Sequence, residues 1–146
     1  MIIKIDGVSV GVNTDAYAAG DLLGKKLTLE KVFEYGPKEP YLTSIVVQDL
    51  SKQNAVIDFI FFDADPAGTT FTNNSALDIA DADLPKVIGF AQVTDYRSFA
   101  DNSVGAVSGL SMAIRPAVDT LYVAMVVRGT PTYAANELSV VFGFVD

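Results

Sequence analysis

Aspartates around one predicted turn are the residues of this sequence with the clearest capacity for chemistry. Asp63 and Asp65 are separated by a single alanine in the stretch Phe61-Phe62-Asp63-Ala64-Asp65-Pro66. Two carboxylates at a turn can bind a hard cation such as Ca²⁺, and a pair can serve as acid and base in the hydrolysis of a sugar. The aspartates that would complete such a site are Asp78, Asp81 and Asp83.

The competing interpretation of these aspartates is structural. Asp is common in turns because its side chain accepts hydrogen bonds from the local backbone. The interleaved acidic positions and the glycine of an EF-hand loop are also missing from this stretch. We therefore favour turn chemistry for Asp63 and Asp65, and we assign no residue a catalytic, cofactor-binding or metal-binding role.

Asp58 is a lone carboxylate in an apolar strand, between Ile57 and Phe59. An unpaired charge is very costly to bury, so this side chain either lies near an edge or faces solvent, or it has a partner. We favour a position near an edge or facing solvent, and the alternative is an ion pair with Arg or Lys of another subunit. Arg115 and Arg128 each close an apolar strand; they are interpreted as solvated strand ends, with interface anchors as the alternative.

The sequence contains no Cys and no His. Thiolate zinc sites, Fe–S clusters, Cys nucleophiles and His-dependent triads all need one of them. The glycines of Gly20-Asp21-Leu22-Leu23-Gly24 do not form a phosphate loop, because no Gly-Lys-Ser/Thr follows. We expect a protein that is not an enzyme and that uses no cofactor.

Charge and length set further bounds. The formal net charge is −8, with 18 acidic and 10 basic residues, so direct binding to nucleic acid is not expected. A length of 146 residues suits one domain over residues 1–146 with a core of its own. No uncharged apolar stretch reaches the ~20 residues that cross a bilayer, and the first residues lack the pattern of a secretory signal. We expect a soluble protein made in the cytoplasm, with no membrane partner.

Two pairs of apolar runs predict β-hairpins. Leu121 to Val127 and Leu138 to Val145 flank a polar loop that contains Gly129 and Pro131. Tyr41 to Leu50 and Ala55 to Phe62 flank a short polar turn. These strands are apolar on both faces, whereas a strand with one solvated face should alternate. One face should lie in the core, and we expect the other faces of Leu121 to Val127 and of Val56 to Phe62 to mediate self-association.

The remaining elements complete an all-β pattern. One helical turn is predicted around Asp81 to Lys86, where Asp81 and Asp83 suit the positive end of the helix dipole. Further short strands are predicted around Ile3, at Lys25 to Phe33, at Thr69 to Thr72, at Val87 to Thr94 and at Gly109 to Arg115. Several short strands without a long helix predict an antiparallel β-sandwich or jelly roll with at most one short helix.

Four stretches carry a resemblance to a known class of proteins. They are Gly20-Asp21-Leu22-Leu23-Gly24, Phe61-Phe62-Asp63-Ala64-Asp65-Pro66, Thr69-Thr70-Phe71-Thr72-Asn73-Asn74, and Leu121-Tyr122-Val123-Ala124 continuing to Val127-Arg128-Gly129-Thr130-Pro131-Thr132-Tyr133. From about Asp15 to its end, the chain resembles small virion structural proteins of tailed bacteriophages. Their closest analogues of this length are β-sandwich or jelly-roll capsid cement, or decoration, proteins, which commonly act as homotrimers.

The resemblance implies a function for the chain. It would bind the major capsid protein on the outer shell of the virion and stabilise the joints between capsomers, as a homotrimer located on the capsid surface. The first alternative is a neck, tail or adsorption component of the same virion. The second is a carbohydrate-binding surface module, and its candidate loop aromatics are Tyr17, Tyr35, Tyr96 and Tyr133. A hydrolase that uses Asp63 and Asp65 ranks last.

Overall fold

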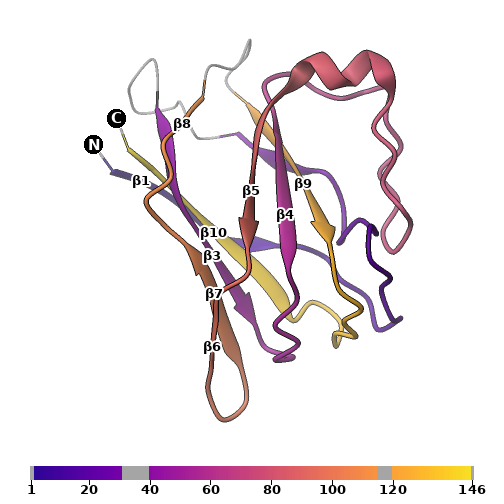
Figure 1. Ribbon diagram of the computed structural model, residues 1–146, viewed down its shortest axis with the longest axis vertical. Coiled ribbons are helices and arrows are strands. Elements are labelled where there is room, and N and C mark those ends of the chain that lie inside the picture. The colour runs from indigo at the N-terminus through magenta and orange to yellow at the C-terminus, as the bar shows by residue number, and fades with distance from the viewer. Residues whose placement is uncertain (1, 31–39, 115–119, 146) are drawn as a thin grey trace.

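The computed structural model describes residues 2–30, 40–114 and 120–145, with side chains described from residue 8 onward within these ranges. The described strands form two antiparallel sheets that pack face to face as a β-sandwich, with one short 3-10 helix beside them (Figure 1). The predicted all-β class with at most one short helix is therefore confirmed for the described residues.

The two sheets take their strands from distant parts of the chain. Across the first sheet the order is β1 (Ile2–Ser9), β10 (Leu138–Val145), β3 (Tyr41–Asp49), β7 (Ser103–Val107) and β6 (Tyr96–Ser98), and β8 (Met112–Ala113) also pairs with β3. Across the second sheet the order is β2 (Leu27–Leu29), β9 (Leu121–Val127), β4 (Ile57–Phe62) and β5 (Val87–Val93). The helix η1 (Asp81–Lys86) directly precedes β5. The β6–β7 hairpin projects beyond the rest of the sandwich (Figure 1).

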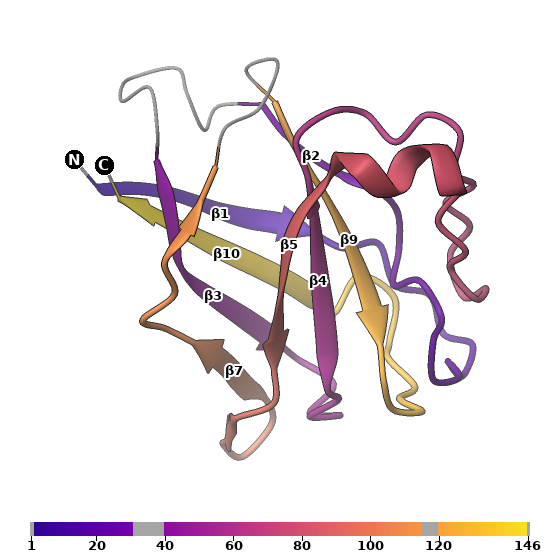
Figure 2. The ribbon, with the colours of Figure 1, turned by 45° about the horizontal axis from the view of Figure 1, so that its top comes forward.

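The core lies between the sheets and comes from alternate residues of the strands. On β10, Leu138, Val140, Phe142 and Phe144 are buried, while the residues between them are partly exposed. The Phe142 ring meets two rings of β4 edge to face, with centroids 6.0 Å from Phe59 and 6.2 Å from Phe61. Such aromatic contacts between the two layers hold the sheets together. Figure 2 shows the two layers, with β4, β5 and β9 in front of β10 and β3.

Both predicted hairpins are wrong. β3 and β4 lie in different sheets, and so do β9 and β10. Instead, β3 pairs with β10, so that Ile45 is opposite Phe142, and β4 pairs with β9, so that Phe59 is opposite Met125. Each connection predicted to be a hairpin turn therefore crosses from one layer to the other.

The structure of the first of these crossings explains the error. The buried Asp49 carboxylate accepts hydrogen bonds from the backbone N–H groups of Ser51, Gln53 and Asn54, at 2.8–3.0 Å. Lys52 and Asn54 have positive φ, at 52° and 54°. The chain thus leaves β3 through a compact turn closed on its own carboxylate. Because a polar turn between apolar runs is common to hairpins and sheet crossings, the sequence pattern did not separate them.

The second crossing, residues 128–137, lies against the first. The Arg128 N–H donates to the Val56 carbonyl at 2.8 Å, and the Ser51 hydroxyl donates to the Glu137 carboxylate at 2.6 Å. The Thr132 N–H donates to the Gln53 side-chain oxygen at 3.0 Å. These bonds join the two crossings into one end of the sandwich, where the chain leaves the first sheet after β3 and returns to it, beside β3, at the start of β10.

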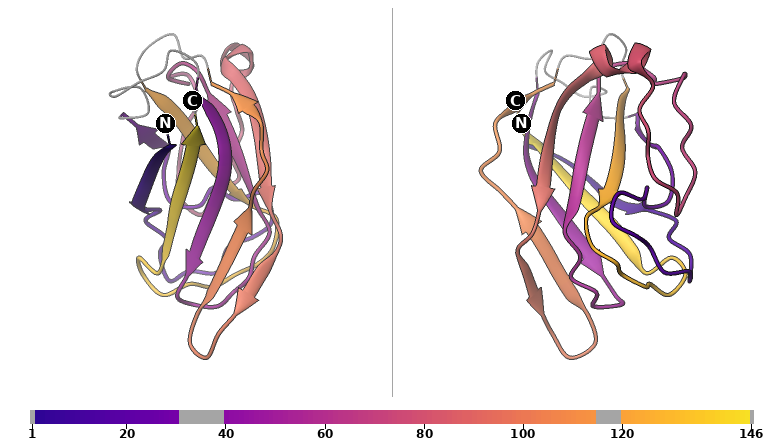
Figure 3. Two further views of the ribbon diagram at one scale, coloured as in Figure 1. Left: turned by 90° about the vertical axis from the view of Figure 1, so that its left-hand side faces the viewer. Right: turned by 45° about the vertical axis from the view of Figure 1, so that its right-hand side comes forward.

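Segment 63–80 folds back against the outer face of the second sheet, beside β9 (Figure 3, right). Its contacts, with those of Leu22, bury a second apolar cluster that contains Phe62 and Ala124. The residues packed around this cluster are Ile60, Phe71, Leu77, Ile79, Val87 and Tyr122. The expectation that these outer strand faces mediate self-association is corrected here, because much of that apolar surface is already covered by the chain itself.

Element boundaries agree with the sequence in places. The predicted helical turn is confirmed as η1, with Asp81 and Asp83 in its first turn, and β5 matches the predicted strand from Val87 to within one residue at its end. No strand forms at residues 69–72, and β6 and β7 are strands that the sequence did not predict. Only Met112–Ala113 forms a strand within the described part of the run predicted from Gly109.

Candidate functional site

The predicted aspartate site is used to hold segment 63–80 in place. The Asp65 carboxylate pairs with the Lys26 ammonium, which also lies 5.4 Å from the centroid of the Tyr122 ring. The Asp63 N–H donates to the Lys86 carbonyl at 3.0 Å. Asp78 and Asp81 are exposed. Among the described residues, no group of three or more acidic side chains is arranged to hold a metal ion.

Asp83 is the buried member of that set. Its carboxylate accepts a hydrogen bond from the Lys86 ammonium at 2.7 Å and another from the Thr69 hydroxyl at 2.7 Å. These two bonds lower the pKa of Asp83 below its usual value, against the opposing effect of burial. The same hydroxyl accepts from the Ala80 N–H at 3.0 Å. Asp83 therefore joins η1 to segment 63–80, which covers the outer face of the second sheet.

Asp58 lies on the outer face of β4, between β5 and β9. Its carboxylate accepts from the Arg128 Nε–H at 2.7 Å and from the Gln92 amide at 2.8 Å, and its side chain is 16% exposed. The position is central in the sheet and not at an edge, and the carboxylate lies on the outer face, where it is partly exposed. The pairing within the chain also supplies the partner that the alternative assigned to another subunit. Arg115 lies outside the described residues.

The tyrosines considered for glycan binding do not form an exposed platform. Tyr17 and Tyr133 are each 2% exposed, and their rings meet edge to face with centroids 6.0 Å apart. The Tyr96 hydroxyl donates to the Ala55 carbonyl at 2.6 Å. Burial raises the pKa of Tyr96 and of Tyr133. Tyr17 and Tyr133 are part of the interior, and Tyr96 is partly exposed and packs against it. Tyr35 lies outside the described residues.

The residues of the four resembling stretches meet on one side of the molecule. The Leu22 N–H donates to the Ser75 carbonyl at 2.9 Å, and the Leu23 N–H donates to the Met125 carbonyl at 2.9 Å. The Asn73 side-chain oxygen accepts from the Gly24 N–H and from the Tyr17 hydroxyl, both at 2.8 Å. These bonds attach segment 63–80 to the second sheet, so the stretches have a structural role.

The outer face of the first sheet has a different character. Its outward-facing residues on β10, β3 and β7 alternate with buried ones, and all are uncharged. They are Ser139, Val141, Gly143 and Val145 on β10, Tyr41, Ser44, Val46 and Gln48 on β3, and Val104 and Ala106 on β7. We call these ten residues the uncharged face. Figure 3 (left) shows β10, β3 and β7 with no described segment crossing in front of them.

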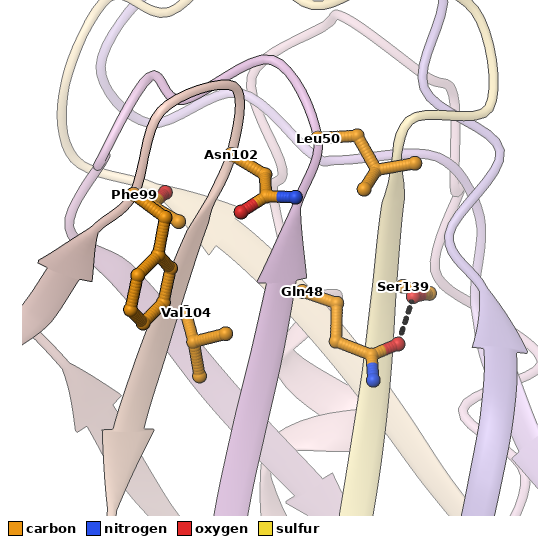
Figure 4. A pocket seen from close by; sticks show the side chains of 7 residues that line it. Gln48, Leu50, Phe99, Asn102, Val104 and Ser139 are labelled. Atoms are coloured by element: carbon orange, nitrogen blue, oxygen red, sulfur yellow. Dashed lines mark hydrogen bonds between the residues drawn. The ribbon is translucent and has the colours of Figure 1, made fainter.

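A shallow hollow of about 360 Å³ lies at one end of the uncharged face (Figure 4). Gln48 and Ser139 lie in its floor, joined by a hydrogen bond of 2.7 Å from the serine hydroxyl. Leu50 and Phe99 line it and are 53% and 56% exposed. Sequence reasoning missed both residues, because an exposed apolar side chain in a turn has no periodic signal; only the unusual presence of Phe among the polar residues 98–108 marks one of them.

Compared with protein-family models, with curated proteins and with solved structures, the chain gives no match. In the part of the chain that the structure describes, no helix is long and apolar enough to span a membrane.

Proposed function

We propose that the chain is a structural protein of a tailed-phage virion, and specifically a cement protein on the outer surface of the capsid. The observation that carries the proposal is the strand order, β1-β10-β3-β7 facing β2-β9-β4-β5. We interpret this order as a jelly roll, an architecture used by viral capsid domains and by lectins. Because a fold alone does not assign a function, the choice of the capsid rests on the resemblance in the four stretches.

The surface of the molecule supports this proposal. A cement protein stabilises a shell by spreading contacts over neighbouring subunits, and each stable contact buries on the order of 1,000 Å². Depletion of charge is a property of the centre of such contacts, and the uncharged face has that property. The projecting β6–β7 hairpin presents Phe99 beside it. An acidic protein of net charge −8 would also stay off the packaged genome.

The mechanism we propose is mechanical. The protein binds the shell where capsomers meet and adds interface area to joints that the pressure of packaged DNA would separate. Its partners in this mechanism are the major capsid protein and further copies of itself. No proton transfer and no cofactor take part.

The test is to add the purified full-length protein to shells that lack it. Saturation at hundreds of copies per shell, with release of DNA shifted to higher temperature, is the result expected of a cement protein. Phe90→Asp and Phe99→Asp make a matched pair, since both phenylalanines are exposed and they lie on different sheets. The variant that loses binding identifies the sheet that faces the shell. If the wild-type protein does not bind shells at any concentration, the cement function is wrong.

Copy number separates the cement function from its first alternative. A neck, tail or adsorption component would be present at few copies per virion and would bind shells only at one vertex, or not at all. The carbohydrate-binding alternative loses its candidate platform, because Tyr17 and Tyr133 are buried. A glycan array remains its direct test, and binding there without binding to shells would favour it over the capsid proposal.

A further inference from the structure

The outer face of the second sheet is covered only in part. Segment 63–80 lies beside β9, and no described segment crosses in front of the end of β5 or the start of β4 (Figure 3, right). The outer residues there form two rows across these strands, since Phe90 is opposite Ile60 and Gln92 is opposite Asp58. We call these four residues, together with Arg128, the open patch.

Phe90 is the aromatic part of the open patch. Its side chain is 72% exposed, more than any other large hydrophobic side chain that the structure describes. It lies on an edge strand, opposite Ile60, which is partly buried against the second apolar cluster. The ring is therefore free to stack on the C–H face of a ligand.

The polar part of the open patch is held in place by hydrogen bonds. The Asp58 carboxylate accepts from the Arg128 Nε–H at 2.7 Å and from the Gln92 amide nitrogen at 2.8 Å. These bonds use one nitrogen of each side chain, which leaves the Nη groups of Arg128 and the amide oxygen of Gln92 to bind a ligand. Arg128 is 49% exposed and Gln92 is also exposed. Oriented donors and acceptors beside an apolar surface are typical of small-ligand sites.

The size of the open patch suits a small ligand. The patch is two strands wide, and β4 has 6 residues. With strands about 4.8 Å apart and about 3.3 Å of rise per residue, it measures roughly 10 Å by 20 Å, or about 200 Å². A standard protein interface buries about 800 Å² on each partner. The patch alone is therefore too small to dock a protein.

We propose that the open patch binds a neutral saccharide. A pyranose ring has C–H groups on its faces and hydroxyl groups at its rim. It can stack on Phe90 while its hydroxyls bond to Gln92 and Arg128. Phe90 and Gln92 are two residues apart on one face of β5, at a spacing of about 7 Å, which one such ring covers together with its hydroxyls.

The chemistry of the open patch selects this ligand over two others. The Asp58 carboxylate already balances the charge of Arg128, so an anionic ligand would meet no uncompensated cation. A wholly apolar ligand would bury the polar atoms of Gln92 and Arg128 without partners, which is costly. A neutral ligand rich in hydroxyl groups satisfies the polar atoms and covers the ring.

This inference does not depend on the proposed function, and the two are compatible. If the uncharged face lies against the shell, the outer face of the second sheet points away from it, because the two faces are on opposite sides of the sandwich. The open patch would then be accessible on the virion surface. The site also differs from the tyrosine platform considered above, since Phe90 is exposed whereas Tyr17 and Tyr133 are buried.

A glycan array that carries neutral and sialylated oligosaccharides tests the inference. The biotinylated full-length protein is displayed as streptavidin tetramers, so that weak binding is detected. The wild-type protein should bind at least one neutral glycan. In calorimetry with that glycan, Phe90→Ala should raise the Kd at least about tenfold, because it removes the stacking surface. Phe99→Ala is the matched control, since Phe99 is an exposed phenylalanine beside the first sheet, and it should leave the Kd within about twofold.

A second variant tests the polar part of the open patch. Gln92→Ala should raise the Kd at least about fivefold, because it removes a hydrogen bond to the ligand. Circular dichroism and thermal melting would establish that the variants are folded. Binding to no glycan, binding to sialylated glycans alone, or a Kd unchanged by Phe90→Ala would each overturn the inference. None of these measurements involves shells, so their failure is separate from failure of the cement function.

Discussion

Gly24→Ala is the substitution for which the structure gives the sharpest expectation. Gly24 has φ of +73°, and a Cβ placed on it would lie 1.6 Å from the Val10 carbonyl oxygen. That contact is with backbone, so no side-chain rotation can relieve it. Val10 is itself buried, and its N–H donates to the Leu138 carbonyl at 3.1 Å. Relief of the clash must therefore move backbone that is bonded to the start of β10.

Gly109→Ala is the matched control. Gly109 has almost the same φ, +71°, but a Cβ there would meet nothing within 4 Å. Its replacement should cost only the left-handed strain of a non-glycine residue, about 1–2 kcal/mol. Gly24→Ala pays the same strain and in addition a displaced segment and a weakened buried hydrogen bond, for a total of about 3–5 kcal/mol.

Urea denaturation of both variants beside the wild type measures this difference in the free energy of unfolding. In thermal denaturation, a loss of 1 kcal/mol lowers the melting temperature by about 2–4 °C for a chain of this length. Gly109→Ala should therefore lower the melting temperature by roughly 2–8 °C, and Gly24→Ala by roughly 6–20 °C. Failure of Gly24→Ala to fold under conditions where Gly109→Ala folds would agree with the reasoning. Equal destabilisation of the two variants would refute it, because it would mean that the close approach to Val10 costs nothing.

Three further predictions concern single side chains. Hydrogen bonds from Lys86 and Thr69 lower the pKa of Asp83 in the folded protein below its value of 3.8 in the unfolded chain. The stability that this carboxylate contributes should therefore be complete above pH 3.8 and be lost as the pH falls through the folded-state pKa. In acid denaturation, the stability of Asp83→Asn should depend less on pH than that of the wild type. Phe142→Ala should lower the free energy of unfolding by about 3–5 kcal/mol in urea, since it removes the ring between two layers, and a loss below about 1 kcal/mol would contradict its place in the core. Asp49→Asn should cost about 1–3 kcal/mol by the same assay, because an amide cannot accept all three N–H bonds of the following turn, and an unchanged midpoint would count against that turn.

The elements of the fold were more predictable than their partners. β4, β5, β9 and β10 were anticipated nearly to their ends, because alternation and β-branched composition are local properties. The pairing of β3 with β10 depends on how the turn after Asp49 is closed, and a polar turn looks the same in a hairpin. The hairpin β6–β7 was missed because its strands are short and contain Ser and Gly, residues that otherwise indicate loops, as does Asn102 in its turn.

The candidate site was less predictable, for a related physical reason. Asp63 and Asp65 lie in one predicted turn, which favours turn chemistry, and the structure pairs Asp65 with Lys26 and Asp83 with Lys86. Sequence alone did not identify Lys26 as the partner of Asp65, because the two residues are 39 positions apart along the chain. Asp58 likewise obtains its partner Arg128 from the residue that follows β9, through a strand pairing that no local pattern encodes.

The uncharged face inverts the expectation drawn from apolar strands. The outer sides of β4 and β9 are more apolar than those of β10 and β3. Segment 63–80 packs against them and buries Phe62 and Ala124. The outer residues of β10 and β3 are smaller, and burying them would stabilise the monomer less per residue, since the free energy gained follows the apolar area removed from water. Packing segment 63–80 against the larger apolar surface therefore stabilises the monomer more than packing it against the first sheet would. The face it leaves open therefore carries the smaller side chains.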